Sequence, residues 1–104
     1  MSQKKKALRE QFRSAVFERD NHKCRLCDCN KNLDAHHITD RSKMPNGGYT
    51  AANGISLCPA HHLAAELFHL TDGKEFHEGM HPNDLYAAIN SSHELALEKS
   101  KQLK

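Results

Sequence analysis

The segment Asn53–His62, with the sequence NGISLCPAHH, decides the fold of this chain. A thiol, Cys58, stands directly before Pro59, and proline is favoured at the first position of a helix. His61 follows Cys58 at the spacing of a zinc knuckle. The segment therefore predicts a short strand over 54–57, followed by a helix whose first turn carries metal ligands.

A second pair of thiols lies earlier in the chain, at Cys24 and Cys27. With Cys58 and His61, this pair supplies the four ligands of a structural Zn²⁺. No apolar stretch follows the basic N-terminus, so we expect no secretory leader, and cysteines in a leaderless chain favour metal binding in a reducing compartment. Disulfides remain the alternative. Cys29 is expected to be a spare thiol or an alternative ligand.

Length and composition limit the classes of protein to consider. A chain of 104 residues is long enough for one domain and buries only a modest core, so a structural metal would add stability. Apolar residues are 38% of the chain, and Trp is absent. No apolar run approaches the length of a bilayer span, so a membrane is not an expected partner.

Charge is distributed unevenly along the chain. Residues 1–43 hold eleven Lys or Arg and six Asp or Glu, whereas residues 44–104 hold four and seven. The basic half also carries the first pair of thiols and a pair of histidines. A polyanion could approach from this side, although a solvated charged helix would have the same composition.

Periodicity and turn residues predict an α+β chain. We expect an amphipathic, basic helix over 5–20, strands over 33–38 and 54–57, and a loop over 40–52. The helix that begins at Pro59 should end at Asp72 and bury a stripe of Leu63, Leu67 and Leu70. Further helices should begin near Pro82 and run over about 92–102, the second with Ser91 and Glu94 as a capping box.

Several residues exceed what a structural zinc requires. His36 and His37 are neighbours on a strand, so their side chains diverge, and one can serve a metal while the other faces a water. His62 projects from the helix toward the same metal. Glu66, one turn later, is either a further oxygen ligand or a solvated residue. The remaining histidines are expected at the surface: His69, His77, His81 and His93.

The order of these elements over residues 19–70 resembles the HNH endonucleases, the nucleases of the ββα-metal (His-Me finger) fold. The resemblance is carried by RDNHKCRLC at 19–27, LDAHHI at 33–38, NGG at 46–48 and NGISLCPAHH at 53–62. It implies a single domain over 1–104, with a ββα-metal core and zinc knuckle at 19–70, the basic helix 5–20 and a C-terminal helical extension over 82–103. His61 stands where the family has a fourth cysteine, which leaves open which of His61 and His62 serves which site.

The same resemblance assigns roles to the surplus residues. His37 would be the general base, and His36 and His62 would bind a catalytic divalent ion together with Glu66. Asn53 would shape the loop between the strands, orient the base or bind metal. The ion would be Mg²⁺, Mn²⁺, Ni²⁺ or Zn²⁺.

The resemblance also implies a setting for this chemistry. The substrate would be DNA, cut to 5′-phosphate and 3′-hydroxyl ends, by a cytoplasmic protein of bacterial or phage origin. A homodimer is left open. The competing hypothesis is a catalytically silent nucleic-acid-binding module stabilised by zinc.

Overall fold

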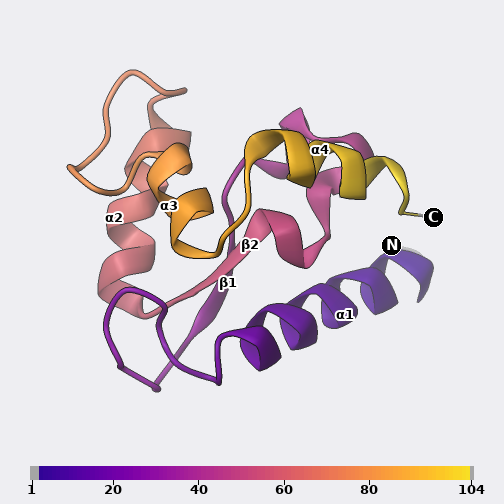
Figure 1. Ribbon diagram of the computed structural model, residues 1–104, viewed down its shortest axis with the longest axis horizontal. Helices are drawn as coiled ribbons and strands as arrows, with labels where there is room; N and C mark the ends of the chain where they lie inside the picture. Colours follow the sequence, from indigo (N-terminus) through magenta and orange to yellow (C-terminus); the bar gives the residue numbers. More distant parts are fainter. Residues whose placement is uncertain (1–2, 104) are drawn as a thin grey trace.

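The computed structural model describes residues 3–103, and residues 1, 2 and 104 of the expected domain lie outside this range. Within it, four α-helices surround a two-stranded antiparallel sheet (Figure 1). The chain order is α1 (Gln3–Arg19), β1 (Asp34–His37), β2 (Gly54–Leu57), α2 (Pro59–Leu70), α3 (Pro82–Ala88) and α4 (His93–Lys101). Three short 3-10 turns lie between the strands, at Arg41–Lys43, Pro45–Gly48 and Ala51–Asn53. The expected mixed α+β class is confirmed.

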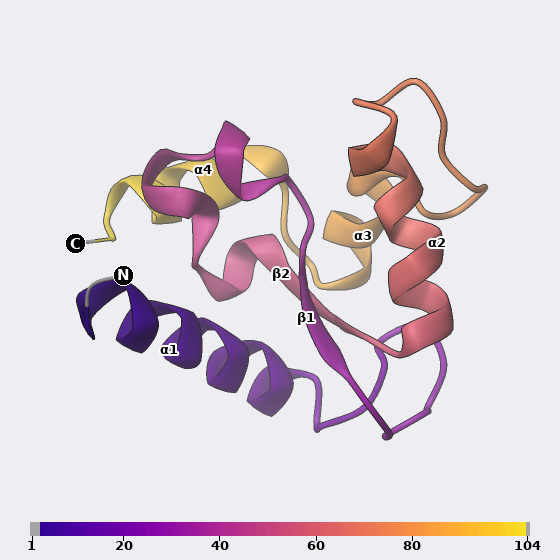
Figure 2. The ribbon, with the colours of Figure 1, turned by 180° about the vertical axis from the view of Figure 1, so that it is seen from behind.

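The two strands place the neighbouring histidines on opposite sides of the sheet. In the register, His36 pairs with Ile55 and His37 with Gly54. Because successive side chains on a strand point to opposite faces, His36 turns toward α2 and His37 toward α1. The two helices lie on either side of the strand pair, as both ribbon views show (Figure 2).

Helix α1 packs closely on β2 because Gly54 has no side chain. A Cβ at Gly54 would lie 2.6 Å from side-chain atoms of both Phe12 and Val16. These two side chains are the buried face of α1. At the end of the helix, the Arg19 guanidinium donates to the carbonyl oxygens of Ala51 and Gly54, each at 2.7 Å. The helix is therefore fixed at both its apolar face and its C-terminal end.

A buried carboxylate, Asp20, connects α1 to the sheet and to the turn that contains Cys24 and Cys27. It pairs with Arg19 at 2.7 Å and Arg25 at 3.2 Å, and it accepts a hydrogen bond from the backbone N–H of Ser56 at 3.0 Å. Burial by itself raises the pKa of Asp20, but the hydrogen bonds from Arg19 and Ser56 outweigh burial and hold the pKa below its ordinary value.

Helix α2 shows a face different from the one expected. Leu63 and Leu70 are 73% and 75% exposed, so the prediction that they belong to the core is wrong. The face turned to the sheet instead carries Ala65 with the polar residues His62 and Glu66. The reason is that Cys58 and His61, at the start of α2, face Cys24 and Cys27, and this arrangement fixes the rotation of the helix.

The C-terminal helices complete the main core. Side chains of α3 and α4 pack with those of β2 and with Ile38, which directly follows β1. The buried members include Ile38, Ile55, Leu57, Leu85, Tyr86, Ile89 and Ala96. The cap of α4 is Ser92, whose hydroxyl accepts from the Leu95 N–H at 3.1 Å. The expected capping residue, Ser91, instead donates to the Ala52 carbonyl. None of the helices within residues 3–103 combines the length and apolar character that a bilayer span requires.

Candidate metal centres

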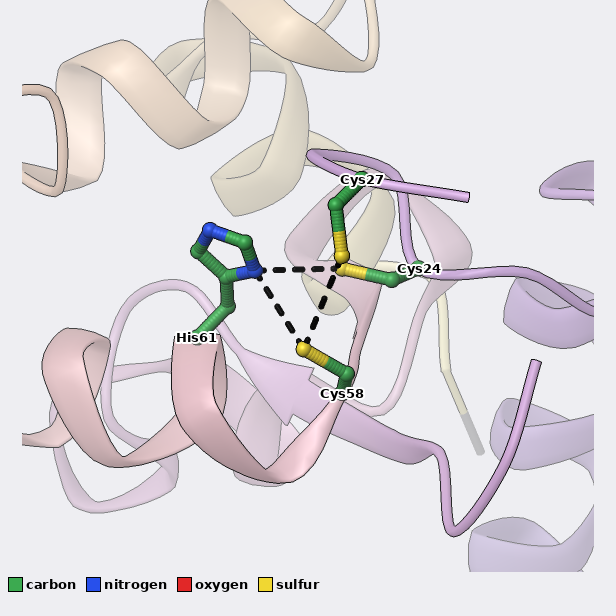
Figure 3. Close-up of side chains that lie close together, drawn as sticks. All are labelled: Cys24, Cys27, Cys58 and His61. Carbon is green, nitrogen blue, oxygen red and sulfur yellow. Dashed lines mark hydrogen bonds between the residues drawn. The ribbon is translucent and has the colours of Figure 1, made fainter. Parts of the chain in front are cut away.

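Cys24, Cys27, Cys58 and His61 converge on one point (Figure 3). The His61 Nδ1 atom lies 3.6 Å from the Cys24 sulfur and 3.3 Å from the Cys58 sulfur, and the Cys27 and Cys58 sulfurs are 3.7 Å apart. A regular tetrahedron around zinc has edges of about 3.8 Å between sulfurs and about 3.5 Å between sulfur and nitrogen. The group can therefore hold a zinc ion.

Two attachments bring the halves of this group together. In the knuckle turn, the Cys24 N–H donates to the Cys29 carbonyl at 2.7 Å, and the Arg25 N–H donates to Ser56 of β2 at 2.9 Å. Cys58 is the N-cap of α2, directly after β2. All four cysteines of the chain are free thiols, so the disulfide alternative is wrong.

The thiols of this group differ in their acid–base properties. The backbone N–H of His61 donates to Cys58 and, together with the His61 ring, lowers the pKa of that thiol to about 6. A hydrogen bond from the backbone N–H of Cys29 likewise lowers the pKa of Cys27. There, however, desolvation and the neighbouring thiols Cys24 and Cys58 prevail and raise the pKa to about 11. Zinc would relieve this competition, since it neutralises several thiolates at once.

A second group of ligands forms on the other side of the first turn of α2, from His36, His62 and Glu66. The Glu66 Oε1 atom lies 3.3 Å from His36 Nδ1 and 3.3 Å from His62 Nε2. Nitrogen and oxygen ligands of a tetrahedral divalent ion lie about 3.4 Å apart. Three protein ligands leave coordination positions open, which is typical of catalytic rather than structural metal sites. His61 therefore belongs to the group with the three cysteines, and His62 belongs to the group with His36 and Glu66.

Two ligands of the second group, His36 and Glu66, are held in the protonation states that a metal needs. Burial lowers the pKa of His36, which keeps its ring neutral at neutral pH. A hydrogen bond from His36 is the main cause that lowers the pKa of Glu66, which stays ionised. Neutral imidazole and carboxylate are the metal-binding forms.

Asp34 orients a ligand of this group, although the sequence analysis assigned it no role. Its Oδ2 atom lies 3.2 Å from His62 Nδ1, so the other ring nitrogen of His62 is directed toward Glu66. The signal in the sequence was strand alternation, because Asp34 and His36 are two residues apart on β1 and share a face.

His37 lies across the strand from this group, packed between two aromatic rings. Its ring stacks on Phe12 with centroids 4.5 Å apart and meets Tyr49 edge to face at 4.9 Å. Burial lowers the pKa of His37 to about 4, and the nearby His36 and Arg41 act in the same direction. The buried Nε2 atom has no hydrogen-bond partner among residues 3–103. The ring is thus neutral at pH 7 with one nitrogen uncommitted.

His69 joins the two histidines, whereas the sequence analysis expected it at the surface. Its Nε2–H donates to the His37 carbonyl oxygen at 2.9 Å, and its ring stacks on that of His36 with centroids 5.2 Å apart. The helical spacing of His62, Glu66 and His69 already indicated one shared face. Of the other expected surface histidines, His77 and His93 are exposed.

Asn53 shapes the loop between the strands and does not reach the metal group. Its side chain is fully buried, and its Oδ1 accepts from the Thr39 N–H at 3.0 Å and the Tyr86 hydroxyl at 2.7 Å. Its Nδ2 donates to the carbonyl oxygens of Thr39 and Gly48. Of the roles expected for Asn53, loop shaping matches these contacts, because the amide is fully used.

The second metal group and His37 open into one cleft of about 280 Å³. Arg9, Arg13 and Arg41 line it together with the carboxylates Asp34, Asp40 and Glu66, so a divalent ion bound at Glu66 would leave the balance of charge positive. Arg13 lies 3.5 Å from Asp34 and 5.0 Å from the Phe17 ring centroid. An anion would therefore meet positive charge on one side of the cleft and metal ligands on the other.

No protein-family model, curated protein or solved structure matches the chain. The fold and the two ligand groups therefore stand on the geometry described above.

Proposed function

We propose that this chain is a metal-dependent endonuclease of the HNH kind, which hydrolyses phosphodiester bonds of DNA. The observation that carries the proposal is the meeting of the His36, His62 and Glu66 group, the His37 ring and three arginines in one cleft. A structural zinc needs none of these residues, because Cys24, Cys27, Cys58 and His61 already form a closed set of four.

Each part of the cleft has a task in hydrolysis. Arg9, Arg13 and Arg41 attract and position the backbone phosphates. The uncommitted nitrogen of neutral His37 accepts the proton of the attacking water. A divalent ion held by His36, His62 and Glu66 would stabilise negative charge on the phosphate and on the leaving 3′ oxygen. His69 stacks on His36, and Asp34 lies against His62, so each supports one ligand.

The acid–base state of His37 agrees with this role and also limits it. Because burial lowers its pKa to about 4, the ring is in the basic form throughout the physiological range. The same burial makes it a weak base, and a base is most effective when its pKa lies near the working pH. A phosphate bound beside the ring would raise the pKa of His37 toward the working pH, whereas a cation would lower it.

The competing function is a zinc-stabilised nucleic-acid-binding module without catalysis. One observation favours it: the Nε2 atom of His37 is shielded from solvent in a ring packed between Phe12 and Tyr49. In that function the arginines contact phosphates and the second group is only a polar patch.

Nicking of supercoiled plasmid DNA in the presence of Mg²⁺, Mn²⁺ or Ni²⁺ tests the proposal. We expect the wild type to nick DNA with at least one added ion, and His37→Ala to lower the rate by about 100-fold or more, as loss of general-base catalysis does. His77→Ala is the matched control, because His77 is exposed and lies outside the cleft.

The outcomes separate the two functions. DNA binding without nicking under all three ions supports the binding module. If His37→Ala nicks as fast as His77→Ala, His37 is not the base, whatever the activity of the wild type.

A further inference from the structure

A second and larger cavity, of about 450 Å³, lies beside the cleft. It is bounded by the loop after β1, the second half of α2 and the beginnings of α3 and α4. Asp40 and His69 line both hollows, so the two share a wall. The two hollows are therefore adjacent, and an extended ligand that passes over Asp40 and His69 would contact both.

Flat rings form much of this second cavity. Phe68 and His81 meet edge to face with centroids 5.1 Å apart, and Tyr86 and His93 do so at 6.4 Å. Tyr86 is only 2% exposed and its hydroxyl is engaged by Asn53, so the accessible ring surface comes from Phe68, His81 and His93. Such walls suit a planar heterocycle, which stacks on rings with little dependence on its identity.

The second cavity offers an anion less positive charge than the cleft, whose lining includes three arginines. Of the Lys and Arg residues within 3–103, only Lys43 lines the second cavity, and it lies 2.6 Å from Asp72 in an ion pair. Asp40, which lines both hollows, adds a carboxylate. A phosphate would be poorly held there. A neutral base is better suited, since exocyclic amino groups of bases donate to carboxylates. The cleft thus suits a phosphate, and the adjoining second cavity suits a base.

We propose that the second cavity receives an unpaired base of the DNA strand whose phosphodiester bond lies in the cleft, so that single-stranded or locally unpaired DNA is the preferred substrate. This inference rests on the nuclease function proposed above. A base inside a duplex is paired and stacked, and it must leave the helix before it can enter such a cavity. A single strand avoids that cost.

A single-stranded oligonucleotide with one internal abasic site, compared with the unmodified strand, tests the inference. Cleavage is mapped bond by bond on a denaturing gel, with Mn²⁺ or Mg²⁺ as the added ion. We expect bonds beside the missing base to be cut about tenfold more slowly than the same bonds in the unmodified strand, because the stacking contribution of that base is lost. The fully paired duplex should be cut more slowly than the single strand.

A substitution in the cavity provides the second arm. Phe68→Leu keeps an apolar side chain but removes the stacking ring, and it should abolish the abasic effect while duplex cleavage is retained. Leu70→Ala, on the same helix but 75% exposed, should behave as the wild type. The abasic comparison in the wild type does not depend on how well this variant folds.

The possible failures of the nuclease and of the base cavity are distinguishable. Equal cutting beside abasic and normal positions, or faster cutting of duplex, overturns the base cavity and leaves the nuclease intact. If no ion supports cutting, the nuclease fails. The cavity is then decided by fluorescence anisotropy, in which equal affinity for a normal strand and for an all-abasic strand overturns it.

Discussion

The Tyr86 hydroxyl donates a hydrogen bond of 2.7 Å to the Oδ1 atom of Asn53, in the interior of the protein. The same hydroxyl lies 2.6 Å from the Thr39 hydroxyl, directly after β1. A residue of α3 thereby holds the loop that connects the two strands. The C-terminal helices are for this reason part of what positions His36 and His37, although they contribute no ligand.

Replacing Tyr86 with Phe tests this connection. We expect a loss of about 1 to 2 kcal/mol in the free energy of unfolding, because Asn53 loses a buried partner while the apolar packing of the ring is kept. Urea unfolding of the zinc-loaded protein measures it. Tyr49→Phe is the control, since the Tyr49 hydroxyl accepts a long hydrogen bond of 3.4 Å from the exposed Arg41. A smaller effect at Tyr86 than at Tyr49 would contradict the assigned role.

Asp20→Asn should be more costly at neutral pH. Removing the carboxylate leaves Arg19 and Arg25 without their shared partner, and breaking a buried ion pair costs about 3 to 5 kcal/mol. The pKa of Asp20 is lowered in the folded state, so its stabilisation is complete above its ordinary pKa and is lost only as the pH falls through the lower folded value. The difference in unfolding free energy between wild type and variant should therefore stay constant from pH 8 to pH 5. A difference that narrows by pH 5 would show that the pKa is raised instead.

Loss of the zinc ligands should unfold the chain. We expect elemental analysis to find about one tightly held zinc per chain in the wild type, and Cys58→Ser to lose both the zinc and the cooperative thermal transition. Cys29→Ser should keep both, because the Cys29 sulfur lies outside the group of four. A Cys58→Ser protein that melts at the wild-type temperature would show that the fold does not depend on the metal.

Asp34→Asn should weaken the second site and spare the first. Asp34 orients His62, and loss of such a supporting carboxylate lowers metal affinity by about 10- to 100-fold. Titration calorimetry with Mn²⁺ or Ni²⁺ on the zinc-loaded protein measures this affinity. Glu98→Gln, an exposed carboxylate on α4, is the control. Equal affinities of the two variants would mean that Asp34 does not support the ligand.

Local signals in the sequence predicted most of the helices and strands and the candidate metal ligands, but they left open which of His61 and His62 joins which group. Strand spacing and the Cys58–Pro59 boundary predicted β2 at its observed bounds and α2 at its observed start, because proline and thiol positions act locally. The divergence of His36 and His37 followed from strand geometry alone. These features depend on interactions between residues close together in the sequence, so they can be predicted from the sequence alone.

The sequence could not predict which face of each helix packs against the rest of the protein. Leucine spacing identified a stripe on α2 at Leu63 and Leu70, but periodicity does not tell which stripe faces the protein. The rotation of α2 comes from a metal group assembled by residues far apart in the chain. The contact of Asn53 with Tyr86 spans 33 positions and depends on the same long-range packing.

His61 and His62 are consecutive residues, and they serve two different ligand groups. Consecutive residues on a helix are separated by about 100° around its axis, so one turn of α2 serves both sides only in its present register. Inserting a single residue between them would leave the group of Cys24, Cys27, Cys58 and His61 unchanged. It would rotate Glu66 and His69 away from the cleft. A substitution in this turn therefore alters one ligand group at a time. An insertion or deletion there changes the position of the second group relative to the first.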